Sequence, residues 1–328
     1  MKVGKFFSEY GVIFAFLVLF MINVVTRGTL FLQPENLRNL ISQDAATGVI
    51  AIGMTMVIIA GGIDLSVGSL TALCGAVVIM TINKIVAGGG GGSLTTTILM
   101  AGLASIAVGA LAGLVNGVLV AYGRVAAFVV TLGGLAGFRS VALVLGRGGE
   151  IRSQLPSVTD FGLGGVHLPI ANVELYYSAI IYLILAVVMS VVLGRTRFGR
   201  HVIAVGANRK AAEYSGINTR AVTTMVFMIL GACVGLAALL VSSRMNSVGT
   251  GSVGLYYELD AIAAVVIGGT SLRGGKGRIW GTIVGLLMLT LINNMITAYH
   301  IDTNWQGLVK GAVILIAVLI QRGSKEDE

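Results

Sequence analysis

The chain has 328 residues and a net charge of +8, with 56% hydrophobic and 11% charged residues and a mean hydropathy of +0.93. A soluble chain of this length could not cover so much apolar surface, so the composition excludes an ordinary soluble domain and predicts an all-α polytopic membrane protein. The basic residues lie between apolar runs rather than in one patch, which argues against a nucleic-acid partner.

Apolar stretches of spanning length follow one another along the chain, so we expect about ten transmembrane helices in a single transmembrane domain, residues 1–328. The first stretch has no small-residue cleavage site after it and is therefore interpreted as a retained span rather than a signal peptide. A short amphipathic piece, residues 34–40, precedes the second stretch. The ten stretches are 11–26, 41–60, 69–86, 98–122, 125–146, 173–193, 219–242, 256–268, 279–299 and 305–320.

The basic residues between these stretches predict the orientation of the chain. With the N-terminus inside, fourteen of them fall in inner segments and six in outer segments. This bias supports ten spans and places both termini on the cytoplasmic side.

Two glycine-rich breaks interrupt the apolar stretches. The first, residues 60–69, contains Gly61, Gly62 and an acid, Asp64; the second, residues 268–277, repeats four of eight positions of the first. In lipid, a broken helix is tolerated where its backbone is buried in protein or faces a water-filled cavity, and paired breaks are typical of a transport path. A tight turn between two hairpin helices is the alternative interpretation of the first break.

Polar residues in or near these breaks and in apolar stretches are candidates for the translocation path: Asp64, Ser66, Ser69, Asn116, Thr270, Ser271, Asn293 and Asn294. The three asparagines could instead join neighbouring helices. Ionisable residues inside apolar stretches are costly and are functional candidates as well; they include Arg139, Glu258, Asp260 and Lys310.

Motifs for ATP, metal or redox chemistry are missing from the sequence. The nearest phosphate-loop candidate, Gly274-Gly275-Lys276-Gly277, has glycine where the hydroxyl residue should stand. Cys74 and Cys233 lie in separate apolar stretches, and the three histidines are far apart in the sequence. We therefore expect no catalytic residue, no metal site and no cofactor in this chain.

The longest basic loop, residues 195–218, contains a short helix-forming run from Arg209 to Tyr214, closed by Ser215 and Gly216. Alanine pairs favour a helix and glycine is a natural stop at its C-terminal end. This short exposed helix predicts a docking surface for a cytoplasmic partner, although the loop could also serve only to orient the chain.

Several longer motifs resemble one known family. They are Gly61 to Ser69; Gly123-Arg124-Val125 with Phe128 to Gly133; Thr196 to Arg200 with Gly206 to Ile217; Tyr257 to Ala264; and Gly268 to Arg278. Together they resemble the permease subunits of bacterial ATP-binding-cassette (ABC) importers for monosaccharides, the ribose, xylose, arabinose and galactose group, with the ribose permeases most similar. The resemblance covers nearly the whole chain.

The resemblance implies a transport subunit rather than an enzyme, in the bacterial inner membrane, working as a homodimer surrounded by lipid. A cytoplasmic ABC ATPase would hold ATP and magnesium, and a periplasmic sugar-binding protein would deliver the sugar. The coupling residues would be Arg209, Lys210, Ala211, Ala212, Glu213, Ser215 and Gly216. Two positions depart from the family pattern: relatives usually have an acid where Arg209-Lys210 stand, and often proline near Ala126-Ala127.

One alternative from another class is an ion-coupled secondary sugar transporter. In that case the acids Asp64 and Asp260, together with Lys310, would form a relay inside the membrane.

Overall fold

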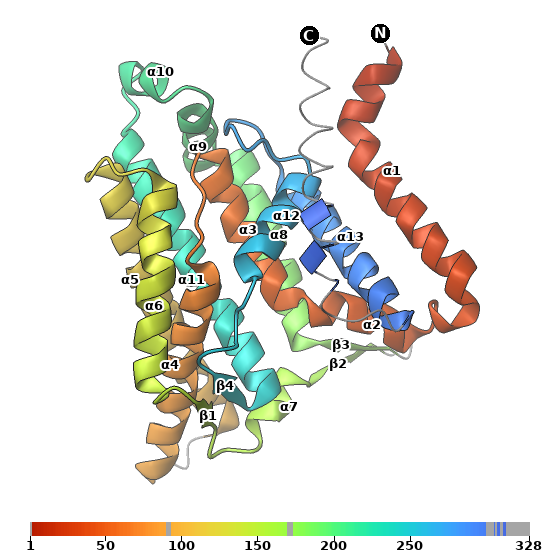
Figure 1. Cartoon of the computed structure of the whole chain (residues 1–328), viewed down its shortest axis with the longest axis vertical. Coiled ribbons are helices and arrows are strands. Elements are labelled where there is room, and N and C mark those ends of the chain that lie inside the picture. Colours follow the sequence, from red (N-terminus) through yellow and green to blue (C-terminus); the bar gives the residue numbers. More distant parts are fainter. Residues whose placement is uncertain are drawn as a thin grey trace.

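The structure of the chain, a computed structural model, describes residues 2–89, 93–168 and 173–299, together with positions 305, 307, 308, 311 and 312. Helices dominate this part of the chain (Figure 1). The longer elements are α1 (Lys2–Arg27), α2 (Pro34–Gln43), α3 (Ala45–Ile59), α4 (Val67–Ala87), α5 (Leu94–Ala121), α6 (Ala127–Leu145), α8 (Tyr177–Arg195), α9 (Arg197–Ala207), α11 (Thr219–Met245), α12 (Tyr257–Ile267) and α13 (Ile279–Ala298). The shorter ones are the 3-10 turn η1 (Gly28–Leu30), α7 (Val158–Gly162), α10 (Arg209–Tyr214) and the strands β1 (Glu150–Arg152), β2 (Gly165–Leu168), β3 (Val173–Tyr176) and β4 (Ser247–Gly249).

The prediction of an all-α polytopic membrane protein is confirmed, but the count of ten spans is too high for the described residues. Seven of their helices are long and apolar enough to cross a membrane, and the pair α2 and α3, bent by 45°, brings the number to eight at most. The predicted tenth stretch, 305–320, lies outside the described residues apart from a few positions.

Two of the predicted spans are not helices of spanning length over the whole predicted stretch. The stretch 256–268 forms α12, whose 11 residues extend about 16 Å, roughly half of a hydrocarbon core. The stretch 173–193 begins not as a helix but as β3, which pairs with β2 in an antiparallel hairpin, Val166 opposite Leu175. The second antiparallel pair joins β1 to β4, with Ile151 opposite Val248.

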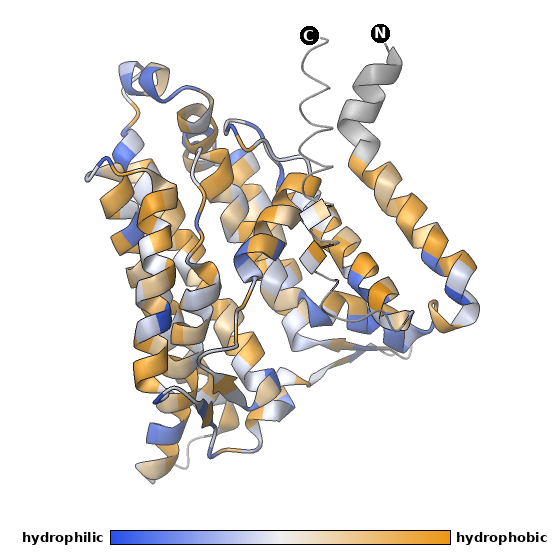
Figure 2. Cartoon of the chain, viewed as in Figure 1, coloured by the Kyte–Doolittle hydropathy of each residue, from blue (hydrophilic) through white to orange (hydrophobic). Residues whose placement is uncertain are grey.

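Hydrophobic residues predominate along most of the length of the helices, and hydrophilic residues gather at α10 and at the opposite end (Figure 2). Large apolar side chains such as Leu103, Val144 and Val187 are exposed on the outside of the bundle. An exposed apolar belt between two polar ends is the distribution that a lipid bilayer requires.

Helix α3 forms the centre of the bundle. All of its 15 residues are buried, and it packs against α8, α9, α11, α12 and α13. The Thr55 hydroxyl lies 2.7 Å from the Thr282 hydroxyl of α13, which forms a polar link between the two helices. A short and mostly apolar helix of this kind is stable in a membrane because neighbouring helices, not lipid, surround it.

Helices α5 and α11 pack closely through small residues. The backbones of Gly109 and Gly231 touch, so that a Cβ on either would collide with the other's carbonyl oxygen. Ser105 donates a hydrogen bond of 2.7 Å to the carbonyl of Gly235. Small residues allow such close approach between transmembrane helices, and they make α5 and α11 a rigid wall on one side of the first break.

Candidate functional site

The first break is built around Asp64. One of its carboxylate oxygens, Oδ1, accepts hydrogen bonds from the backbone N–H of Ser66 at 2.7 Å and from the Ser66 hydroxyl at 2.6 Å. Helix α4 begins at the next residue, Val67. The first turn of a helix leaves N–H groups without partners and carries a partial positive charge, so the acid both fixes and stabilises the start of α4.

Helices α4 and α5 contribute side chains to the same place. Asn116 of α5 donates from Nδ2 to the Ser66 hydroxyl at 3.1 Å, and Ser69 donates to the Ser66 carbonyl at 2.8 Å. All four side chains are buried. The structure therefore brings together four of the predicted path residues, Asp64, Ser66, Ser69 and Asn116, which we call the polar break.

The depth of the polar break follows from its contacts with α6. Thr131 donates to the carbonyl of Ile63 at 3.3 Å, and a Cβ on Gly134 would lie 3.1 Å from that of Ser66. Gly134 lies in the middle third of α6. Because α6 is long enough to cross a membrane, the polar break lies near mid-depth rather than in a surface turn.

A half-length helix, α12, starts at the same depth. The β4–α12 loop, residues 250–256, runs from β4 to the start of α12, and α12 continues toward the α10 end, whereas α4 runs the opposite way (Figure 1). The two starts meet where the backbones of Gly68 and Gly254 touch, with the Glu258 carboxylate beside Gly68. Acids thus lie at both helix starts, Asp64 before α4 and Glu258 and Asp260 in the first turn of α12, where they offset the positive ends of both helices.

The second break lies elsewhere, at the α10 end of the bundle. Its residues turn back through backbone bonds from Ser271 to Lys276 and from Gly274 to Ser271. Thr270 is buried beneath this turn. The structure thus separates Thr270 and Ser271 from the polar break, although the sequence grouped them.

Asn293 and Asn294 lie on α13, also apart from the polar break. The Asn294 side chain bonds to the guanidinium of Arg27 and, at 3.5 Å, to the amide of Asn36. These contacts join α13 to α1 and α2, the helix-joining role that the sequence left open for Asn294.

The predicted helix of the basic loop is α10, and it forms through local signals. The Asn208 side chain accepts the N–H of Ala211 at 3.0 Å, which caps the start of the helix. Gly216 has a left-handed φ of 81° and ends it. Ala212 is buried, whereas Tyr214 is 90% exposed. An exposed ring beside two cations forms a surface suited to a protein partner.

Glu213 connects α10 to the start of α11. Its Oε1 accepts a hydrogen bond of 2.7 Å from the Thr219 hydroxyl and lies 3.7 Å from Arg209. The Thr219 hydroxyl, and more weakly Arg209, lower the pKa of Glu213 below its ordinary value.

Helices α9 and α10 reach both breaks through one backbone junction. Gly275 of the second break donates its N–H to the carbonyl of Ile59 at 2.8 Å. Gly206, near the end of α9, packs against the same carbonyl and against Gly274 and Gly275. Ile59 is the last residue of α3, directly before the first break. Helix α9 is therefore in direct contact with the start of the first break and with the last residues of the second.

Comparison with known proteins decides the family. Residues 36–318 match the family described as the permease component of the branched-chain amino acid transport system. The chain belongs to this family.

Individual curated relatives are similar to this chain over most of its length. The ribose import permease protein of Escherichia coli K12 is 39% identical over 319 residues, covering 95% of this chain and 93% of the relative. The ribose import permease protein of Bacillus subtilis 168 is 39% identical over 297 residues, 89% of this chain and 86% of the relative. The xylose transport system permease protein of Haemophilus influenzae Rd is 33% identical over 359 residues, 93% of each chain. No solved structure gives a significant match.

These matches confirm the resemblance to monosaccharide permeases. The permease is a transport subunit and not an enzyme, and its family implies partnership with an ABC ATPase and a substrate-binding protein. The ion-coupled alternative is not favoured. One member of its relay, Lys310, lies outside the described residues.

Sequence reasoning missed three features of this permease: the role of Gly206, the exposed ring of Tyr214, and the partners of Arg139. Only Arg139 carried a signal, as a cation within an apolar stretch. Its guanidinium donates from Nη1 to the carbonyls of Thr250 and Val253, each at 2.9 Å.

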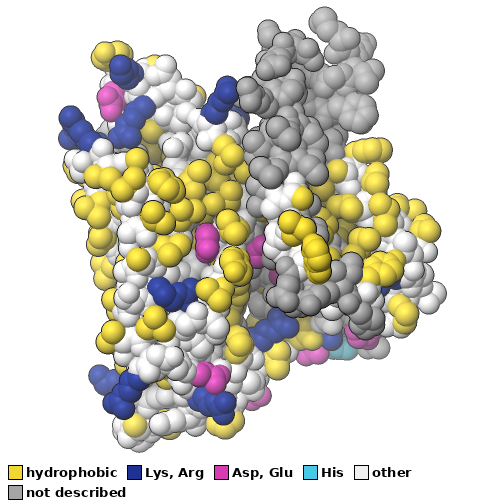
Figure 3. All heavy atoms as spheres, viewed as in Figure 1, with side chains coloured by type: hydrophobic (Ala, Val, Ile, Leu, Met, Phe, Trp, Pro, Cys, Tyr) yellow, Lys and Arg dark blue, Asp and Glu magenta, His cyan; other side chains and the backbone are white. Residues whose placement is uncertain are grey.

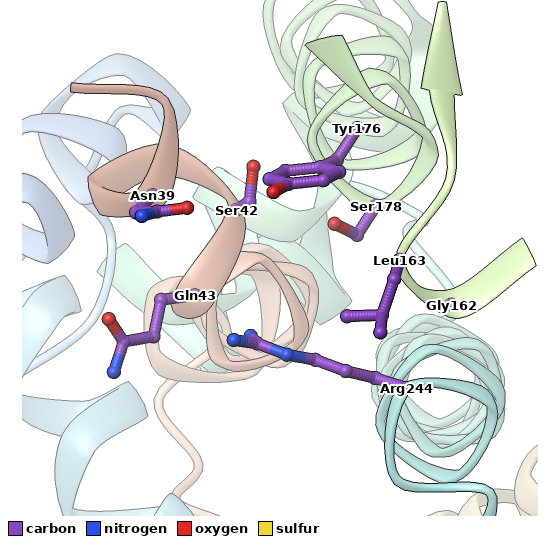
Figure 4. A pocket seen from close by; sticks show the side chains of 8 residues that line it. All are labelled: Asn39, Ser42, Gln43, Gly162, Leu163, Tyr176, Ser178 and Arg244. Carbon is purple, nitrogen blue, oxygen red and sulfur yellow. The ribbon is translucent and has the colours of Figure 1, made fainter. Parts of the chain in front are cut away.

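The permease also has a shallow polar hollow at the end opposite α10. It is lined by α2, α7, β3, α8 and α11, and its polar side chains include Asn39, Gln43, Tyr176, Ser178 and Arg244. In Figure 4 the Arg244 side chain extends from α11 toward Gln43 of α2. Amide, hydroxyl and guanidinium groups of this kind bind polar surfaces rather than lipid.

Proposed function

We propose that this chain is the membrane-spanning permease subunit of an ATP-driven, binding-protein-dependent importer of ribose or a similar monosaccharide. The ribose and xylose permeases named above support the substrate class. The observation that carries the mechanism is the junction of Ile59, Gly206 and Gly275, which connects the exposed helix α10 to both breaks.

The polar break is the mid-depth part of the sugar path. Sugars are neutral and rich in hydroxyl groups, so their path should offer hydrogen-bond donors and acceptors without a strong net charge. The hydroxyls of Ser66 and Ser69, the Asn116 amide and the Asp64 carboxylate supply such groups from α4, α5 and the break itself. Thr270 and Ser271, at the α10 end, line the exit of the sugar.

Helix α10 and its flanks dock on the partner ATPase, which holds ATP and Mg²⁺. The coupling residues are Arg209, Lys210, Ala211, Ala212, Glu213, Ser215 and Gly216. All of them except Ala212 are exposed, and the buried Ala212 anchors the helix to the rest of the chain. When the ATPase closes on ATP, it moves α10 and α9, and Gly206 transmits the movement to Ile59 and Gly275.

The α10 end of the permease is cytoplasmic, in the inner membrane of a bacterium. Arg195, Arg197 and Arg200 surround this end, in agreement with the positive-inside rule. Helix α1 begins at the same end (Figure 1), which supports a cytoplasmic N-terminus; the proposal for a cytoplasmic C-terminus concerns residues outside those described. The opposite end faces the sugar-binding protein.

A second copy of the chain completes the transporter, and lipid covers the remaining belt. ATPases of this class work in pairs, and one coupling helix per chain therefore requires two permease copies.

Charge reversal of the coupling helix tests the proposal. In proteoliposomes that contain the ATPase and the sugar-binding protein, R209E/K210E should lose ATP-driven uptake of ribose and should no longer co-purify with the ATPase, because both cations are exposed on α10. The matched control for ATPase binding is R152E, which should still co-purify with the ATPase, since the Arg152 side chain is 81% exposed at the opposite end.

Two results would contradict the proposal. One is normal uptake and normal ATPase binding by R209E/K210E. The other is sugar movement along an ion gradient by the purified chain alone, which would identify a secondary transporter.

A further inference from the structure

Arg139 is a cation in the middle third of α6, a helix that crosses the membrane. A charged side chain at this depth is costly in lipid, so it persists where it pairs with other groups or serves a path. Figure 3 shows acidic and basic side chains at mid-height on a face that is otherwise largely hydrophobic. Among the described residues of α6 and α12, the charged ones are Arg139, Glu258 and Asp260.

The guanidinium of Arg139 holds the β4–α12 loop. Its two bonds of 2.9 Å end on carbonyls of this loop, those of Thr250 and Val253, and it interacts electrostatically with Glu258 at the start of α12. Hydrogen bonds from a charged donor are among the stronger ones in proteins. Arg139 thus ties α6 to the loop and to α12 at once.

What the contacts of Arg139 control follows from the position of the β4–α12 loop. On the outer side the loop continues from β4, and Thr250 also donates to the carbonyl of Gly149 at 2.8 Å. At mid-depth its Gly254 packs on Gly68, beside the polar break. The loop therefore lies between the outer end of the chain and the polar break.

The loop has exposed side chains and one strained backbone position. Ser252, Leu255 and Tyr256 are exposed. Tyr256 has a left-handed φ of 66°, a conformation that is uncommon for a residue with a large side chain and is relieved when the chain rearranges.

We propose that Arg139 holds the β4–α12 loop closed over the polar break, and that sugar reaches the break from the outer side only when the bonds from Arg139 to this loop are broken. Arg139 is a positioning residue: it acts through the loop rather than through contact with the sugar. This inference rests on the proposed transport function.

A cysteine in the loop reports the opening. Val253 is 7% exposed, so V253C is a buried thiol, and the native Cys74 and Cys233 are buried as well. We would measure the rate at which an external, membrane-impermeant maleimide labels V253C in right-side-out membranes containing the full transporter. V253C/R139Q should be labelled at least about tenfold faster than V253C alone, since two charged hydrogen bonds are lost.

Matched variants separate this result from a general loosening of the protein. V253C/R152Q should be labelled at the rate of V253C, because Arg152 is an exposed arginine at the same end with a local partner, Glu150. If R139Q does not reach the membrane, R139K replaces it; lysine keeps the charge but lacks the fork of donors, and its rate should also rise. Equal labelling rates with and without an intact Arg139 would overturn the proposal.

The same assay distinguishes the gate from the proposed function. With Arg139 intact, ATP loaded inside the vesicles, together with ribose and the sugar-binding protein added outside, should speed labelling of V253C during turnover. If R139Q speeds labelling but turnover does not, the role of Arg139 in closing the loop is supported and the proposed sugar import is contradicted. If turnover speeds labelling but R139Q does not, the proposed sugar import is supported and the role of Arg139 in closing the loop is contradicted.

Discussion

The junction between α9 and the two breaks predicts the effect of a single methyl group. In G206A the new Cβ would overlap the Ile59 carbonyl oxygen and lie 2.7 Å from the N of Gly275 and 2.8 Å from the carbonyl carbon of Ile59. Backbone atoms cannot move aside as a flexible side chain can. Overpacking of this kind costs about 1–3 kcal/mol, and loss of the bond from Gly275 to Ile59 adds about 0.5–1.5 kcal/mol.

A cost of about 2–4 kcal/mol to the form in which Gly275 is bonded to Ile59 shifts the equilibrium by roughly 30-fold or more toward the form in which this bond is broken. We therefore expect G206A to hydrolyse ATP in the assembled transporter while moving much less sugar per ATP. The assay is the ratio of ribose uptake to phosphate release in proteoliposomes. Helix α10 itself should stay folded, because Asn208, which caps its start, and Gly216, which ends it, are unchanged.

The control is G194A, because Gly194 is a glycine near the end of α8 with no atom within 4 Å of an added Cβ. Alanine there should leave the ratio unchanged and slightly favour the helix. If G206A transported with the same ratio as G194A, the junction would not transmit the movement, and the reasoning would be refuted.

Two further predictions concern Asp64 and Glu213. D64A removes the acceptor of two hydrogen bonds at the start of α4, so the free energy of unfolding should fall by about 2–4 kcal/mol, with a smaller loss in D64N, which keeps an oxygen. Thermal unfolding in detergent measures both, and a D64A protein as stable as its parent would contradict the assignment. Because the pKa of Glu213 is lowered, mainly by Thr219, its stabilisation of α10 is present above the ordinary glutamate pKa of about 4.3 and is lost as pH falls through the lowered pKa. Hydrogen exchange of the α10 amides, corrected for the intrinsic rate, should rise over that range, and T219V should exchange faster already at neutral pH; identical profiles would show that the Thr219 bond does not hold α10.

Most long helices could be predicted from hydropathy, because an apolar stretch of spanning length has few alternatives in lipid. Helix α10 could be predicted from its local alanines and Gly216. The bounds of α12 were predicted to within one residue, but the stretch was wrongly counted as a span, because its 11 residues are too short to cross a membrane. Gly254 and Tyr256, which both have left-handed backbone angles, lie directly before the helix.

The candidate site was predictable only where its residues are neighbours in the sequence. Asp64 and Ser66 are two residues apart, and the acid within a glycine break marked both. Asn116 carried a weaker signal, an amide in an apolar stretch, because its bond to Ser66 spans two helices. The junction of Ile59, Gly206 and Gly275 gave no signal, since it joins three distant segments through backbone atoms and the chain has 47 glycines.

The contact between the start of α4 and the half-length helix α12 has a consequence for biogenesis. Helix α12 is too short to stop in the bilayer alone, and the loop before it has backbone groups that lipid cannot satisfy. During synthesis this segment therefore has no stable place until α4 and α6, made more than a hundred residues earlier, are in position to receive Gly254 and the carbonyls of Thr250 and Val253. Insertion of the C-terminal part thus depends on prior assembly of the N-terminal part, and the permease completes its membrane topology as a step of tertiary folding.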